Sequence, residues 1–356
     1  MDINLPTNPE ILKLVSHLDQ FRGFWASGAA VPPDRLARLH EATRIQSVAA
    51  SCRIAGIRVA EAEVATVLSG TGAMTALHLE IAGYATAVDR AFPHLGPLVT
   101  GDEIATLNAV VMGKHGDPPA PSPIRDAPLH LEVFDADGRA LGRVLQTLPP
   151  RLLRDKIEDL VTWLELELRS SDKHPLLVIG AVFIFLTAIS PYERGNGRTA
   201  RAMLPHLLRR AGYGFADYAS LERVFDEMRL GYYDAIDASQ TKLWTDEADL
   251  TPWLTFYLRA LSVLATRLQA KVDLELQARE LPPLQRAILE TIREHGTGAA
   301  SLLLTATGAN RNTLKDNLRR LVDRGLLERI GSKRGTFYRI ATGEAPVAAV
   351  AAGDEA

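Results

Sequence analysis

The chain has 356 residues, of which 47% are hydrophobic and 23% are charged, and its formal net charge is −3. These values are typical of a globular protein of two or three domains, and they argue against a nucleic-acid surface that covers the whole protein. The one cysteine, Cys52, excludes an internal disulfide and is typical of a reducing compartment. No N-terminal segment resembles a signal peptide, and the apolar run 175–189 is short for a membrane span. We therefore expect a cytoplasmic protein without a membrane partner.

Helical periodicity dominates the chain and predicts a mainly α fold. A proline-dense loop over 116–128 precedes two alternating segments, 129–134 and 143–147, which are typical of a β-hairpin. Thr100 and Glu103 have the spacing of a capping box. Helices are expected at 35–56, 59–68, 80–88, 100–112, 150–168, 175–189, 202–211, 221–236 and 251–278.

The stretch 190–201, which reads S-P-Y-E-R-G-N-G-R-T-A-R, joins the apolar helix 175–189 to the helix 202–211. Its two glycines allow close backbone approach, so the free N–H groups at the start of the second helix can form a nest for an oxyanion. Arg198 and Arg201, three residues apart, would face the same anion. A bare G-N-G-R is equally compatible with a helix-helix turn and solvated arginines, so the inference depends on the whole string.

That string resembles the signature of the Fic family, H-P-F-x-(D/E)-G-N-G-R-x-x-R, whose members mostly transfer AMP from ATP to a hydroxyl side chain of a target protein. The resemblance implies a Fic-type helical bundle with a β-hairpin flap that would hold the target backbone, although any hairpin would look the same. Ser190 stands where the family has its general-base histidine, and Arg194 stands where it has a metal-binding acid, with a carboxylate only at Glu193. The nucleotide- or phosphate-binding positions are Arg194, Gly195, Asn196, Gly197, Arg198 and Arg201.

Residues 51–56, S-C-R-I-A-G, resemble the inhibitory motif (S/T)-x-x-x-E-(G/N) of many Fic proteins. Ser51 and Gly56 match, whereas Ala55 replaces the glutamate that pairs with the second motif arginine, here Arg201. Small residues on a helix also arise from packing alone. If the resemblance holds, Arg201 is free for a phosphate or is paired with a group that the sequence does not reveal.

The C-terminal segment, with helices at 284–295, 300–308 and 310–325 and a hairpin of 326–330 and 336–340, resembles a winged helix-turn-helix. Residues 310–340 carry nine basic and three acidic side chains, the charge pattern of a DNA-binding surface. Winged helices also serve as protein-interaction or dimerisation modules. The candidate DNA contacts are Arg311, Asn312, Lys315 and Arg319 on the third helix and Lys333 and Arg334 in the wing.

These observations predict four segments: an N-terminal helical region with the inhibitory-type helix (1–95), a Fic-like core (96–270), a winged helix-turn-helix (281–341) and a disordered tail (342–356). Serine cannot replace an imidazole base, and a guanidinium at position 194 would repel Mg²⁺ unless Glu193 reached round. Ser190 has no partner in the sequence that would make it a nucleophile. We therefore expect a catalytically degenerate protein without a bound metal, which keeps a phosphate pocket for ATP or another nucleotide and acts as an oligomeric DNA-binding regulator. The alternative is an active Fic-type transferase that moves a nucleotide phosphate group to a hydroxyl of an unknown target protein.

Overall fold

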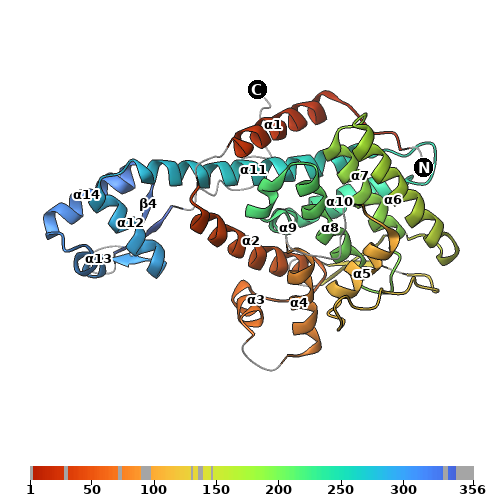
Figure 1. Ribbon diagram of the computed structural model, residues 1–356, viewed down its shortest axis with the longest axis horizontal. Coiled ribbons are helices and arrows are strands. Elements are labelled where there is room, and N and C mark those ends of the chain that lie inside the picture. Colours follow the sequence, from red (N-terminus) through yellow and green to blue (C-terminus); the bar gives the residue numbers. More distant parts are fainter. Residues whose placement is uncertain are drawn as a thin grey trace. The chain divides into compact units, whose positions relative to one another are not determined.

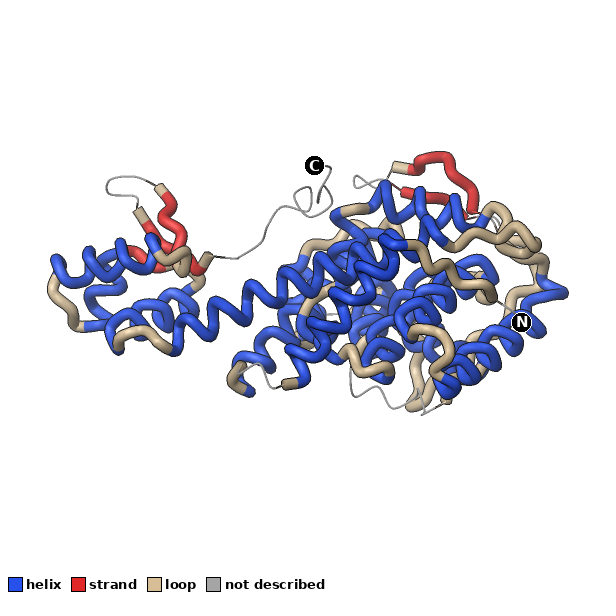
Figure 2. The backbone as a smooth tube through the Cα atoms, turned by 90° about the horizontal axis from the view of Figure 1, so that it is seen from above, coloured by secondary structure: helices blue, strands red, loops and turns tan. Residues whose placement is uncertain are grey.

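The computed structural model describes residues 3–27, 31–70, 74–89, 98–129, 131–134, 139–145, 147–331 and 336–341. Helices make up most of these residues, and their strands form two small sheets (Figure 2). The predicted mainly helical fold is therefore confirmed. The chain divides into two compact units, the first built mainly from residues 34–265 together with the first helix, and the second mainly from residues 266–349.

Most helices of the first unit lie where the apolar periodicity placed them, and the predicted capping box of Thr100 and Glu103 is confirmed. The apolar run after residue 174 forms a single helix, since its side chains are buried on all sides. The helices are α1 (Pro9–Ala26), α2 (Pro33–Ile54), α3 (Glu61–Leu68), α4 (Ala76–Ala87), α5 (Gly101–Val111), α6 (Leu153–Ser170), α7 (Pro175–Ile189), α8 (Asn196–Arg210), α9 (Leu221–Glu227), α10 (Arg229–Gln240) and α11 (Thr251–Arg279), with 3₁₀ turns η1 (Pro150–Leu152) and η2 (Gly214–Tyr218).

Three helical features differ from the expectation. Helix α1 was not predicted, although the Asn8 side chain accepts a hydrogen bond from Ile11 N–H (2.9 Å) and Pro9 occupies the first helical position. Helix α8 begins at Asn196, six residues earlier than expected, so the glycine-rich turn is its first turn. The helix expected at 221–236 is two helices, because the backbone of Met228 leaves the helical conformation (φ −103°, ψ 28°).

Helix α7 is the centre of the first unit. It lies beside α6, and α8 packs against both α7 and α5 (Figure 1). Gly180 allows α11 to approach closely, since a Cβ there would lie 2.6 Å from Leu254 Cδ2, and Trp253 Nε1 donates to the Gly180 carbonyl (2.7 Å). The end of α7 and the start of α8 are consequently fixed by the core. None of the helices in the described part of the chain is both long and apolar enough to span a bilayer.

The predicted hairpin is confirmed as strands β1 (Leu131–Phe134) and β2 (Ala140–Leu145), which pair antiparallel with Leu131 opposite Leu145. The second strand begins three residues earlier than expected. Thr147 Oγ1 donates to the Leu129 carbonyl (2.8 Å), which fixes the base of the hairpin.

The second unit contains α12 (Pro283–His295), β3 (Gly298–Ala299), α13 (Ala300–Thr307), α14 (Arg311–Asp323), β4 (Leu327–Ile330) and β5 (Phe337–Ile340). The strands form one sheet in the order β3-β5-β4, and the short strand β3 was not expected. Apolar side chains of α12, α13 and α14, with Ile288, Leu303 and Leu318 at the centre, form its own hydrophobic core. Lys333, Arg334 and the tail 342–356 lie outside the described residues.

Candidate functional site

The candidate site begins where α7 ends, at Ser190. This residue caps α7 in the left-handed conformation (φ 43°), which only a few per cent of non-glycine residues adopt. The Ser190 side chain is fully buried, and its hydroxyl donates to the carbonyl of Thr187 (2.6 Å). The position that the family resemblance gives to the general base is therefore occupied by a hydroxyl whose proton is engaged within the end of the helix.

Arg125 holds the backbone at the same point. Its buried guanidinium donates to the carbonyls of Ser190 (2.8 Å), Leu148 (2.5 Å) and Ala127 (2.7 Å). Burial lowers the pKa of Arg125, yet the three carbonyl dipoles that face it favour the cation. The resemblance to the motif gave no reason to select this arginine.

The turn into α8 is fixed by side chains of the motif itself. Asn196 accepts from Tyr192 N–H (2.9 Å) and donates to the Tyr192 carbonyl (2.6 Å). Gly195 has φ +80°, and a Cβ on it would lie 2.6 Å from Met112 Sδ. Asn108 of α5 donates to the Arg194 carbonyl (3.0 Å), so the turn is held from both sides.

Helix α8 has no side-chain cap at its N-terminus. The first intrahelical bond closes from Thr199 N–H to the Gly195 carbonyl (2.8 Å), which leaves the N–H groups of the first turn without an intrahelical acceptor. A helix N-terminus of this kind favours an anion through its free donors and its dipole.

An open cavity of about 500 Å³ lies over this helix start and brings the predicted site residues together. Ala55 of the inhibitory-type segment also lines it, whereas Ser51 and Gly56 do not. Gly56 instead follows the end of α2 in the left-handed conformation (φ +79°). Its N–H donates to the Arg53 carbonyl, and the N–H of Ile57 donates to the Cys52 carbonyl. The predicted residues that line the cavity are Ala55, Ser190, Arg194, Gly195, Asn196, Gly197, Arg198 and Arg201, joined among others by Val133 of β1, Glu193 and Tyr232.

Glu80 of α4 joins two of the motif arginines. Its carboxylate accepts from Arg198 Nη2 at 2.7 Å and from Arg194 Nη2 at 3.1 Å. The Glu80 side chain is 11% exposed and that of Arg198 is 5% exposed, whereas that of Arg194 is 68% exposed. The other terminal nitrogen of Arg198, Nη1, is buried and has no hydrogen-bond partner among the described residues.

Arg201 is paired with a group that the sequence did not reveal. Its Nε donates to Ser51 Oγ (2.9 Å), its Nη2 donates to the Ser51 carbonyl (3.0 Å), and Tyr232 lies at 3.4 Å from Nη1. The guanidinium is fully enclosed, with 3% of the residue exposed. Ser51, the residue that matches the start of the inhibitory motif, thus holds this arginine through both its hydroxyl and its carbonyl.

A buried hydrogen-bond chain continues from Arg201 to Glu222. Ser51 is hydrogen-bonded to Tyr84, and the Tyr84 hydroxyl donates to Glu222 Oε1 (3.0 Å). Burial and the Glu222 carboxylate raise the pKa of Tyr84 well above its ordinary value, so this phenol keeps its proton. Glu222 is therefore connected to Arg201 through the hydroxyl groups of Tyr84 and Ser51.

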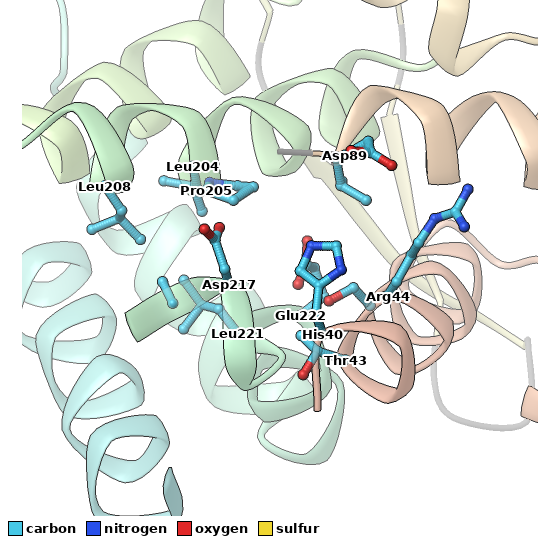
Figure 3. A pocket seen from close by; sticks show the side chains of 13 residues that line it. His40, Thr43, Arg44, Asp89, Leu204, Pro205, Leu208, Asp217, Leu221 and Glu222 are labelled. Carbon is cyan, nitrogen blue, oxygen red and sulfur yellow. The ribbon is translucent and has the colours of Figure 1, made fainter. Parts of the chain in front are cut away.

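Glu222 also lines a second and much smaller cavity, of about 40 Å³ (Figure 3). His40, Thr43 and Arg44 of α2 face it together with Asp217, and all of these side chains are labelled in the view. The volume is enough for a few water molecules but not for a nucleotide. The cavity over α8, which gathers the motif residues, is therefore the candidate ligand site.

The candidate DNA-contacting residues lie on the exposed face of α14. Asn310 caps this helix by accepting from Thr313 N–H (2.8 Å), and Leu314, Leu318 and Leu321 turn into the core of the second unit. The predicted residues Arg311, Asn312, Lys315 and Arg319 are all exposed.

Comparisons with known proteins identify relatives of this architecture. Residues 98–208 match the model of the Fic/DOC family. The chain is 29% identical over 151 residues to "Protein adenylyltransferase Fic" of Drosophila virilis, an alignment that covers 39% of this chain and 28% of that protein. The chain thus spans well under a third of that relative's length.

Solved structures share the fold at low sequence identity. A Fic family protein from Desulfovibrio desulfuricans is 21% identical, with a TM-score of 0.62, over 96% of this chain and 98% of that one. A Fic domain containing signaling protein from Bacteroides thetaiotaomicron is 18% identical, with a TM-score of 0.57, over 74% of this chain and 96% of the other. Fic-1 from C. elegans is 19% identical, with a TM-score of 0.56, over 74% and 73% of the two chains.

Proposed function

We propose that this chain, whose residues 98–208 match the model of the Fic/DOC family, keeps the phosphate-binding part of the family's site but not its transfer chemistry. The observation that carries the proposal is Ser190, which stands at the position of the general base and whose hydroxyl donates a hydrogen bond to the carbonyl of Thr187. The chain would then act as a nucleotide-responsive regulator and not as an efficient transferase.

Transfer of a nucleotide to a protein hydroxyl needs a base that takes up the hydroxyl proton. Serine does not titrate near neutral pH, and the buried Ser190 hydroxyl already has an acceptor. Loss of a positioned general base costs about 10²–10⁴-fold in rate. Any remaining transfer by this site would therefore be slow.

The residues around position 194 do not fit the divalent ion that the family's acid would hold. Arg194 places a cation there, and its nearest carboxylate, Glu80, is engaged by two guanidinium groups. Glu193 is exposed on the cavity rim, one residue before the required position. Mg²⁺ takes oxygen ligands in near-octahedral geometry, and a guanidinium offers none.

The cationic part of the site supports a phosphate ligand without a metal. The N-terminus of α8, Arg194 and Arg198 all border the cavity, with Arg201 beneath them. Arg194 would supply the positive charge that a metal gives elsewhere in the family. A nucleoside di- or triphosphate matches this charge, and the cavity of about 500 Å³ has the size of a small-molecule site.

A transfer assay with purified protein tests the proposal against the alternative of an active transferase. The protein is incubated with labelled ATP, CTP, GTP or UTP and Mg²⁺ or Mn²⁺, and transfer to itself or to lysate proteins is measured. We expect no transfer by the native chain and transfer by the double variant Ser190→His, Arg194→Asp. A robust signal from the native chain that disappears in Arg198→Ala would establish the alternative.

We further propose that the second unit is a winged helix-turn-helix that binds DNA. The exposed face of α14 carries Arg311, Lys315, Arg319 and Arg320, and an Asn310 cap fixes the start of the helix. Among the acidic residues of this helix, Asp323 lies 3.7 Å from Arg319, an exposed contact that is worth little. The surface is therefore cationic, as binding to DNA phosphates requires.

Fluorescence anisotropy with labelled duplex DNA over a range of salt concentrations tests this second function. We expect the affinity for DNA to fall steeply as the salt concentration rises. The single variant Lys315→Gln and the double variant Lys333→Gln, Arg334→Gln should both bind DNA more weakly, and their affinity should depend less on salt. The matched control is Lys156→Gln in the first unit, which should leave the affinity unchanged. Salt-independent binding, or equal affinity in all variants, would contradict the proposal. The oligomeric state that we also expect is read from the molar mass in solution with and without DNA.

A further inference from the structure

The carboxylate of Glu80 pairs with two arginines of the candidate site. It contacts the buried Arg198 at 2.7 Å and the exposed Arg194 at 3.1 Å. These two arginines border the cavity, and the carboxylate comes from α4, outside the motif and outside the segment that matches the family model. The chain itself thus supplies a negative charge to two of the arginines that border the cavity.

Arg198 remains only half satisfied by this contact. Its Nη2 has Glu80 and Met112 Sδ as partners, but its Nη1 is buried without any hydrogen-bond acceptor in the part of the chain that the structure describes. A buried donor of a charged group that lacks an acceptor costs free energy. A phosphate oxygen that accepted a hydrogen bond from Nη1 would remove this cost.

We propose that Glu80 is an internal counter-ion that competes with phosphate for Arg198 and Arg194, so that the site opens only to ligands carrying several negative charges. This inference rests on the proposed phosphate-binding function. A ligand with a single negative charge would merely replace the charge that Glu80 already supplies. A polyphosphate brings additional charge for Arg194 and for the N-terminus of α8, and so outcompetes the carboxylate.

The release of Glu80 is a side-chain rotation and not a movement of α4. Helix α4 is locked against α5, because a Cβ on Gly83 would lie 2.1 Å from the Val110 carbonyl oxygen and 2.9 Å from Gly113 N. Such contact leaves no room for the helix to slide. The glutamate side chain has three rotatable bonds of its own, and its partner Arg194 is largely exposed and can turn with it.

Binding of ATP, inorganic triphosphate and AMP to the full-length chain, measured by calorimetry in EDTA, tests the inference. In Glu80→Gln, we expect ATP and triphosphate to bind at least about tenfold more tightly than in the native chain, a gain of about 1.4 kcal/mol. In Glu80→Asp, the shorter side chain cannot reach both arginines, so the affinity for ATP and triphosphate should rise by a smaller factor. This variant replaces Glu80→Gln in the test if the glutamine variant does not fold. The preference for ATP over AMP should narrow in both variants.

Glu193→Gln is the matched control, because Glu193 lines the same cavity but forms no ion pair among the described contacts. The affinity of this variant for ATP should differ from that of the native chain by less than threefold, which is the effect of one screened charge. Loss of ATP binding in Arg198→Ala would show that the native chain binds ATP through this arginine. If Glu80→Gln then binds ATP no more tightly than the native chain, the counter-ion role of Glu80 is refuted while phosphate binding stands. If neither the native chain nor either Glu80 variant binds any of the three probes, both proposals fail.

Discussion

Replacing Arg125 by methionine tests how the chain positions Ser190 and the candidate site. The guanidinium of Arg125 donates hydrogen bonds of 2.8 Å or less to three backbone carbonyls, those of Ser190, Leu148 and Ala127. Methionine has a similar length but no donor, so the three carbonyls would lose their partner in a buried environment. At about 1–1.5 kcal/mol for each hydrogen bond, the variant should lose about 3–4.5 kcal/mol of unfolding free energy.

Urea unfolding followed by tryptophan fluorescence is a suitable assay for Arg125→Met. All four tryptophans, Trp25, Trp163, Trp244 and Trp253, lie in the first unit, so their signal reports the unit that contains the site. The matched control is Arg259→Met, since the ion pair of Arg259 with Glu10 is half exposed and should contribute less than about 1 kcal/mol. Equal unfolding free energies for the two variants would refute the argument that Arg125 anchors the end of α7.

Three further predictions follow from the same contacts. Burial lowers the pKa of His206 below 6.5, so the neutral imidazole is the stabilising form; the unfolding free energy should fall as the pH drops from 7 to 5, and His206→Gln should flatten that dependence in urea titrations. Burial raises the pKa of Cys52, so its thiol should not react with Ellman's reagent until the protein is unfolded by urea. Gly195→Ala should lower the melting temperature of the first unit, measured by circular dichroism, by several degrees, because φ is +80° and Met112 Sδ would lie 2.6 Å from the new Cβ.

The parts of the fold that the sequence predicted are those set by local chemistry. The Thr100–Glu103 capping box and the apolar helix α7 depend only on neighbours within a few residues. Helix α1 was missed although Asn8–Pro9 is a local start signal, so better use of the sequence would have found it. The break at Met228 had no such signal, since neither glycine nor proline marks it.

The site shows the same division between local and distant contacts. The motif around Asn196 was visible in the sequence, but the partners of its arginines come from far along the chain, 118 residues away for Glu80 and 150 residues for Ser51. One signal for Glu80 was present, because it is the sole acidic residue of the otherwise largely apolar helix α4. A lone carboxylate within an apolar helix predicts a buried cationic partner, although it does not identify which one.

The contacts of the motif residues distinguish residues that stabilise the fold from a residue that has a donor left for a ligand. Asn196 and Gly195 hold the turn into α8, and Arg201 is bound by Ser51, so their presence follows from the structure alone. Arg198 is different, because the residue lines the cavity and its buried Nη1 has no acceptor among the described residues. The ion pair with Glu80 uses only Nη2 of Arg198, so a side chain with fewer donors could also form it. The second donor of Arg198 is therefore the group of this motif that the proposed phosphate would bind.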